Sequence, residues 1–138
     1  MKILFVCKYN AFRSRIAEEY FKKINKNSKI EVYSRGIIMG GDSDNVQRKI
    51  ARELLGVNIA KRKPLPLNIE EMKKTDKIIV VADDVPLIVF NYHLIPIWKR
   101  VKIWKIKDEQ KQNKKNIKQI ALQIKERVEK LENEHRTS

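Results

Sequence analysis

The sequence predicts an α/β fold: a single-domain, three-layer sandwich with a four-stranded parallel sheet and helices on both faces. Apolar runs that read as strands alternate with amphipathic helical stretches along the whole chain, as expected for strands joined by right-handed crossovers. The chain has 138 residues and shows neither an internal repeat nor a linker, so one domain is expected over residues 1–138. Hydrophobic residues make up 42% of the sequence, which is enough for a core.

The first half of the chain predicts strand, helix, strand and helix in that order. The apolar run at residues 3–6 is continuous, as in a strand buried on both faces. Apolar residues recur every three or four positions after Arg13 and again after Ser43, which is the helical period. Gly56 stands where the second helix would be capped. The predicted ranges are 1–7, 13–25, 30–34 with an end at Gly36, and 43–55.

The second half predicts two more strands and a long final helix. The run IIVVA is strongly apolar and rich in β-branched residues, which favours a buried strand. Prolines punctuate the segments on either side of it and indicate loops. The predicted ranges are a loop at 61–68, a helix at 69–74, strands at 78–82 and 101–106, a short helix or irregular segment at 85–93, and a helix at 111–133.

Composition excludes several classes of protein. One cysteine rules out a disulfide framework, and the two histidines, His93 and His135, lie too far apart for a zinc cluster, so no metal or other cofactor is expected. The apolar run near the N-terminus is too short for a signal peptide, and no stretch is long enough for a membrane span. We therefore expect a soluble, cytoplasmic protein. The net charge of +14 indicates anionic partners without specifying them.

The segment from Cys7 to Ser14 joins the first predicted strand to the first helix. Ligands of such sheets bind beyond the carboxyl ends of the strands. There a tight loop and a helix N-terminus offer N–H groups to a tetrahedral anion. The positive electrostatic potential of these groups also favours a thiolate over a thiol. Arg13 can hold two oxygens of that anion with its planar guanidinium. This arrangement predicts a phosphate-binding loop with a nucleophile, Cys7, beneath the phosphate; a buried structural cysteine is the alternative.

The residues CKYNAFRSRIAEEYF resemble the active-site segment of the low-molecular-weight protein-tyrosine-phosphatases and of the thioredoxin-coupled arsenate reductases that share their fold. The family pattern is Cys, five residues, Arg, Ser, with Asn at the third loop position. The resemblance continues weakly through Ser34-Arg35-Gly36 and through residues 75–84. It implies that Cys7 and Arg13 are catalytic. It also implies substrate binding by the loop residues Lys8, Tyr9, Asn10, Ala11, Phe12, Arg13 and Ser14.

The same resemblance implies a general acid at Asp108, after the fourth strand. An alkoxide or phenolate leaves poorly unless it is protonated, which is the chemical need for this residue. A solvated loop carboxylate or a helix cap is the alternative for Asp108, and Asp83 or Asp84 is the next candidate for the acid. The sequence departs from the family at Glu109, Gln110 and Lys111, where a proline and an aromatic pair are usual.

These observations predict a cysteine-dependent phosphatase that hydrolyses phosphomonoesters of the phosphotyrosine type through a phosphocysteine intermediate. Its partners would be a phosphorylated protein or small phosphomonoester, and inorganic phosphate as the product. No cysteine follows Cys7, so an arsenate-reductase-like enzyme would need an external thiol. A non-catalytic protein that binds phosphate or nucleic acid is a third hypothesis. The nucleic-acid version rests on the basic charge beyond residue 99, although alternating charges on a solvated helix face explain that charge equally well.

Overall fold

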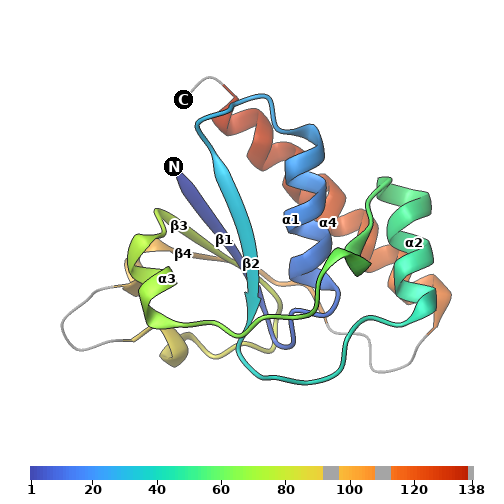
Figure 1. The fold of residues 1–138 in the computed structure, drawn as a ribbon, viewed down its shortest axis with the longest axis horizontal. Helices are drawn as coiled ribbons and strands as arrows, with labels where there is room; N and C mark the ends of the chain where they lie inside the picture. The colour runs from blue at the N-terminus through green and yellow to red at the C-terminus, as the bar shows by residue number, and fades with distance from the viewer. Residues whose placement is uncertain (92–96, 108–112, 137–138) are drawn as a thin grey trace.

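The computed structural model describes residues 1–91, 97–107 and 113–136. A four-stranded sheet has the order β2-β1-β3-β4, and all neighbouring strands are parallel (Figure 1). This confirms the predicted fold class. The elements are β1 (Lys2–Cys7), α1 (Arg13–Ile24), β2 (Glu31–Gly36), α2 (Asn45–Leu55), η1 (Ile59–Lys61), α3 (Ile69–Lys74), β3 (Lys77–Val81), η2 (Leu87–Phe90), η3 (Ile97–Arg100), β4 (Val101–Trp104) and α4 (Lys114–His135).

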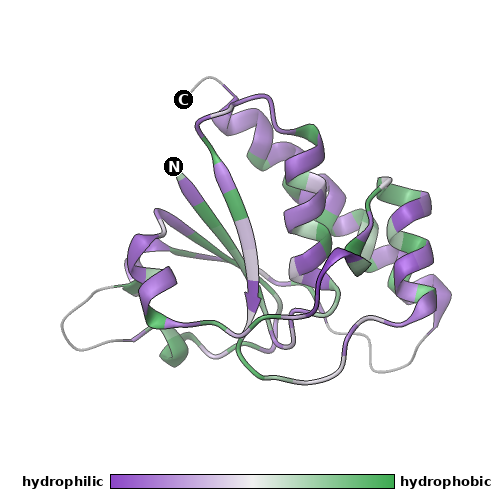
Figure 2. Ribbon diagram, viewed as in Figure 1, coloured by the Kyte–Doolittle hydropathy of each residue, from purple (hydrophilic) through white to green (hydrophobic). Residues whose placement is uncertain are grey.

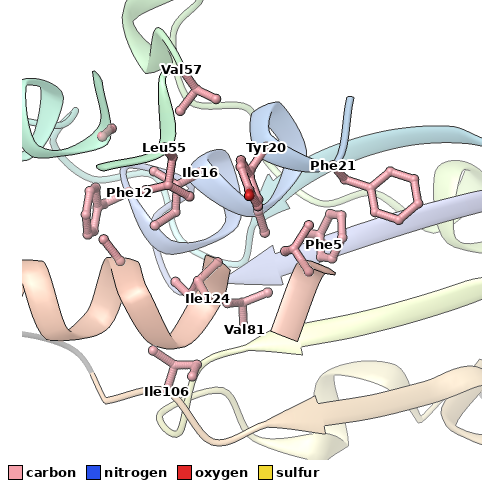
Figure 3. Close-up of a cluster of buried hydrophobic side chains, with 14 of the residues drawn as sticks. Phe5, Phe12, Ile16, Tyr20, Phe21, Leu55, Val57, Val81, Ile106 and Ile124 are labelled. Carbon is pink, nitrogen blue, oxygen red and sulfur yellow. The ribbon is translucent and has the colours of Figure 1, made fainter. Parts of the chain in front are cut away.

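Two apolar cores lie on opposite faces of the sheet, because successive strand side chains point to opposite sides. Phe5 and Val81 belong to the larger core, which α1, α2 and α4 cover (Figures 1 and 3). Leu4 and Val80 belong to the smaller core beside α3 and the short 3₁₀ helices. Apolar residues concentrate in the strands, whereas the exposed sides of the helices are polar (Figure 2). The observed layers are therefore helix, sheet and helix. None of the helices in the described part of the chain has the length and apolarity to cross a bilayer.

Local sequence signals fix the ends of the second helix. The Asp44 side chain accepts a hydrogen bond from the Gln47 N–H, and the Gln47 side chain accepts one from the Asp44 N–H. This capping box satisfies two backbone donors at the start of α2. At the other end Gly56 adopts a left-handed conformation, with φ of 67°, and its N–H bonds to the Arg52 carbonyl at 3.0 Å. The helix therefore begins two residues later than predicted, because Asp44 rather than an earlier residue is its cap.

Two segments of the second half differ from their predicted ends. Strand β4 ends at Trp104 rather than residue 106, because the Ile106 N–H turns back to the Trp104 carbonyl at 2.7 Å. The final helix runs two residues beyond its predicted end, and its described start is Lys114, where Asn113 is the N-cap. The short helix or irregular segment predicted at 85–93 contains the 3₁₀ helix Leu87–Phe90, in agreement with the prediction.

The topology places the end of β1 at the reversal of strand order. Strand β2 pairs with one side of β1, and β3 pairs with the other. In parallel α/β sheets the chain connections diverge at such a point and leave a crevice beyond the carboxyl end of the strand. Cys7 is the last residue of β1 and lies in register with Gly36 at the end of β2. A Cβ on Gly36 would lie 2.6 Å from the Tyr9 carbonyl carbon and 2.7 Å from the Asn10 nitrogen. Glycine at this position thus lets the loop after β1 pack directly against β2.

Gly36→Ala tests this close approach. The added methyl group has no room beside rigid backbone, so we expect the variant to lose about 1–3 kcal/mol of unfolding free energy. Urea unfolding followed by circular dichroism measures the loss. Gly41→Ala is the matched control, because no atom lies within 4 Å of a Cβ there. Equal stability of the two variants would contradict the proposed packing.

Candidate active site

The loop between β1 and α1 is short and is held in one unusual backbone conformation. Asn10 has a φ of 57°, and it is the one non-glycine residue with positive φ among the described residues. Asparagine tolerates this left-handed region better than most residues. Asn10 is also completely buried. The loop therefore turns sharply at a residue whose side chain is available for internal hydrogen bonds.

The Cys7 sulfur lies at the base of this loop with two hydrogen-bonding neighbours. The Asn10 N–H donates to Sγ at 3.3 Å, and Ser14 Oγ lies 3.0 Å from Sγ. Asn10 Nδ2 donates to the same Ser14 oxygen at 2.8 Å, which leaves the Ser14 hydroxyl proton available to the sulfur. The loop thus places one backbone N–H and one hydroxyl group within hydrogen-bond distance of Sγ.

The Asn10 side chain connects the loop to two other segments. Its Nδ2 also donates to Ser34 Oγ at 2.9 Å, near the end of β2. Its Oδ1 accepts from Arg62 Nη1 at 3.1 Å and from the Leu65 N–H at 3.0 Å. Because donors and acceptors occupy opposite ends of the amide, the network defines the orientation of the Asn10 side chain. The side chain therefore anchors the loop to β2 and to the segment after η1.

A buried carboxylate, Glu18, completes the network behind Asn10. Glu18 Oε1 accepts from Ser34 Oγ at 2.6 Å and from Arg62 Nη2 at 2.9 Å, and Glu18 Oε2 accepts from Lys22 Nζ at 2.6 Å. Burial by itself raises the pKa of Glu18, but hydrogen bonds from Lys22 and Ser34 and the charges of Lys22 and Arg62 lower that pKa overall. Glu18 is thus held ionised as the counterion of Arg62.

Arg13 begins α1 and is almost completely buried, with 4% of its surface exposed. Its Nη1 donates to the Ile106 carbonyl at 3.0 Å, and its Nη2 donates to Asp84 at 3.2 and 3.4 Å. Asp84 follows the central strand β3 and Ile106 follows the edge strand β4, so both partners lie beyond the carboxyl ends of neighbouring strands. They fix the plane of the guanidinium group, which is what a fork of N–H donors needs to bind an oxyanion specifically. The structure thus gives Asp84 an ion pair with Arg13.

The remaining predicted loop residues have different surroundings. Phe12 is buried in the larger core, so only its backbone is available to a ligand (Figure 3). Lys8, Tyr9 and Ala11 are half-buried at the loop surface, and Lys8 Nζ lies 5.2 Å from the centre of the Tyr9 ring. The candidate acid Asp108 lies outside the described residues.

Sequence reasoning missed the roles of Ser34 and Arg62. Ser34 was noted only as part of a weak resemblance, and Arg62 lies in a basic, proline-punctuated segment whose composition gives no signal for a buried partner. Arg15 was also missed. It is fully buried, its Nη2 donates to the Ile59 carbonyl, and within the described residues its Nε and Nη1 have no hydrogen-bond partner. No group of three or more metal-ligating side chains occurs in the described ranges.

The ionised state of Glu18 predicts a pH dependence of stability. Its folded pKa lies below the ordinary value of 4.5, so the stabilisation is present above that pH and is lost as the pH falls through the folded pKa. Glu18→Gln should lower the unfolding free energy at neutral pH by about 1–3 kcal/mol. It should also flatten the fall in stability on acidification, which urea unfolding at several pH values would measure. Glu126→Gln, at an exposed position on α4, is the control; a wild-type slope in Glu18→Gln would refute this role.

Comparison with known proteins agrees with this geometry. The solved structures that share the fold include a cysteine-to-serine mutant of the arginine phosphatase YwlE, in which the active-site serine is phosphorylated (TM-score 0.84, 18% identity, 100% of this chain and 97% of that chain). They also include an arsenate reductase in the phosphate-binding state (0.74, 27%, 96% and 97%). A third is Wzb from Vibrio vulnificus in complex with benzylphosphonate (0.82, 20%, 96% and 97%).

Sequence comparison gives the family directly. A search of curated protein sequences found no significant match. The family model described as "Low molecular weight phosphotyrosine protein phosphatase" matches residues 2–137, which is nearly the whole chain. This match confirms the resemblance stated from residues 7–21 and indicates a cysteine-based phosphatase. The chain belongs to the low-molecular-weight phosphotyrosine protein phosphatase family.

Proposed function

We propose that this protein hydrolyses phosphomonoesters of the phosphotyrosine type through a phosphocysteine intermediate. The observation that carries the proposal is the position of the Cys7 sulfur, within hydrogen-bond distance of the Asn10 N–H and the Ser14 hydroxyl, at the base of a loop that ends at buried Arg13. A sulfur nucleophile at the base of a loop that ends at a guanidinium suits attack on a phosphate dianion. The phosphorylated serine in the related arginine phosphatase supports a covalent phosphoryl-enzyme on this fold.

The reaction has two steps. In the first, the Cys7 thiolate attacks phosphorus in line, an S–P bond forms, and the P–O bond to the leaving group breaks while Arg13 holds equatorial oxygens. A general acid gives its proton to the leaving oxygen. In the second step that group, now a base, takes a proton from water, whose oxygen attacks phosphorus and releases the Cys7 thiolate and inorganic phosphate.

Asp108 is our candidate for the acid, and it stays a prediction because it lies outside the described residues. The ion pair between Asp84 and Arg13 supports a different task for Asp84, because both of its carboxylate oxygens accept from Arg13 Nη2 and hold the guanidinium at the anion site. We therefore assign Asp84 the positioning of Arg13 and leave the proton transfers to Asp108.

The alternative of an arsenate reductase is supported by two neighbours, with 27% and 25% identity. Cys7 is the one cysteine of the sequence, so reduction of an oxidised Cys7 would need a thiol from another molecule. Hydrolysis of a phosphomonoester needs no such thiol, and for that reason we prefer it. A cytoplasmic location stays a prediction.

Hydrolysis of para-nitrophenyl phosphate under reducing conditions tests the nucleophile and the anion site. Cys7→Ser should reduce turnover to background, because a serine hydroxyl is far less acidic than a thiol at neutral pH. Arg13→Lys should lower kcat/KM about 100-fold or more, because lysine replaces a bidentate fork by a single point charge. Lys49→Arg, at an exposed position on α2, is the control for effects of mutagenesis and purification on folding. Full activity of Cys7→Ser would overturn the proposal.

A comparison of leaving groups tests the assignment of the acid. We expect Asp108→Asn to slow hydrolysis of phenyl phosphate about 100-fold or more, and that of para-nitrophenyl phosphate much less, because nitrophenolate leaves without a proton. Asp84→Asn should slow both substrates to a similar degree, because it disturbs Arg13 rather than proton transfer. The reverse pattern in kcat would identify Asp84 as the acid.

A further inference from the structure

A cavity of about 510 Å³ lies between the chain just beyond β4 and the first half of α4. Its described lining contains cations and amides, with one apolar residue and no carboxylate. The lining residues are Lys105, Lys107, Asn116, Gln119, Ile120 and Gln123. Such a set offers hydrogen-bond donors and positive charge to a negatively charged group.

This cavity adjoins the active site through one residue. The Ile106 carbonyl accepts from Arg13 Nη1 at 3.0 Å, and Ile106 lies between Lys105 and Lys107 in the chain. Ile106 is buried, whereas both lysines are exposed, so the two ammonium groups lie away from the core while the residue between them holds Arg13. A molecule bound at Arg13 therefore has this cavity as a neighbour.

The two lysines of the cavity differ from several other lysines of the described chain. Among the residues that the structure describes, neither Lys105 nor Lys107 has a carboxylate within ion-pair distance, whereas Lys22, Lys61 and Lys73 each have one. The cavity further along α4 is different, because Glu126 and Glu134 lie among its basic residues. Within the described ranges, the cavity on either side of Ile106 therefore carries positive charge without a carboxylate partner.

We propose that this cavity, formed by Lys105, Lys107 and the amides of Asn116, Gln119 and Gln123, binds an acidic segment of a phosphorylated protein substrate. The inference rests on the proposed function and adds a substrate class to it: phosphoproteins with aspartate or glutamate near the phosphorylated residue. Two lysines match a short acidic cluster. A nucleic acid fits less well, because its continuous phosphate backbone would meet Glu126 and Glu134, and no aromatic ring lines the cavity for base stacking.

Matched phosphotyrosine peptides provide the kinetic test. One peptide carries glutamates on both sides of the phosphotyrosine, and the other carries glutamines. At low ionic strength the wild type should show a kcat/KM about 10-fold higher for the glutamate peptide, because two ion pairs of modest strength add to its binding. The double variant Lys105→Glu, Lys107→Glu should abolish or reverse this ratio. The ratio cancels any general effect of the substitutions on the chemical step.

The control variant is Lys26→Glu, Lys29→Glu, which makes the same change in net charge. Both lysines are exposed between α1 and β2, at the opposite edge of the sheet from Cys7. This control should keep the wild-type preference. Loss of preference in the control as well would overturn the proposal, because overall charge rather than the cavity would then explain the preference.

A binding measurement separates this inference from the proposed function. Fluorescence anisotropy of a labelled glutamate peptide without phosphate should show weaker binding, by about 5-fold or more, to Lys105→Glu, Lys107→Glu than to the control variant. This result requires no turnover, so it stands even if para-nitrophenyl phosphate is not hydrolysed. Equal binding to both variants while para-nitrophenyl phosphate is hydrolysed would overturn the cavity assignment alone. Displacement of the peptide by a single-stranded oligonucleotide, with tighter binding of the oligonucleotide, would also overturn it.

Discussion

The Asn10 side chain is the constraint on which the active site depends. A left-handed turn at a non-glycine residue is unfavourable by itself, and here five hydrogen bonds through the backbone and side chain of that residue stabilise it. The same bonds place the Asn10 N–H against the Cys7 sulfur and hold the Ser14 hydroxyl within hydrogen-bond distance of it. The shape of the loop and the surroundings of the sulfur are therefore one physical arrangement.

Two arginines beside the loop, the buried Arg13 and the partly buried Arg62, are each paired with a carboxylate, and the pairs have different tasks. Arg62 with Glu18 lies behind the loop and connects helix α1, strand β2 and the segment after η1. Arg13 with Asp84 lies in front, where the guanidinium meets the proposed phosphate. A buried charge without a counterion would destabilise the folded state. Glu18 and Asp84 therefore stabilise the arginines at the carboxyl edge of the sheet. A phosphate bound at Arg13 must therefore share the guanidinium group with the negative charge of Asp84.

Much of the fold could be predicted from the sequence because it depends on local patterns. The continuous apolar run of β1 and the helical period after Arg13 predict the ends of β1 and α1 to within one residue of the observed ends. The end of β4 was wrong, because the turn at Ile106 depends on backbone bonds to Trp104 and Asp83 rather than on residue type. For the site, Cys7 and Arg13 could be identified by their spacing along the chain. Arg62, Ser34 and Asp84 could not be given their places, because their contacts are created only by tertiary packing.

The residues that hold the loop by hydrogen bonds lie far from it along the sequence, and this has a consequence for how the site forms during biosynthesis. Asn10 bonds to Arg62 across 52 positions, and Arg13 bonds to Ile106 across 93. The last of these anchors belongs to the final third of the chain, so a growing polypeptide cannot complete the environment of Cys7 until most of it has been synthesised. Until then the loop lacks the partners that hold Asn10 and Arg13 in place. The complete surroundings of Cys7 thus belong to the finished molecule, and a chain truncated before residue 106 cannot form them.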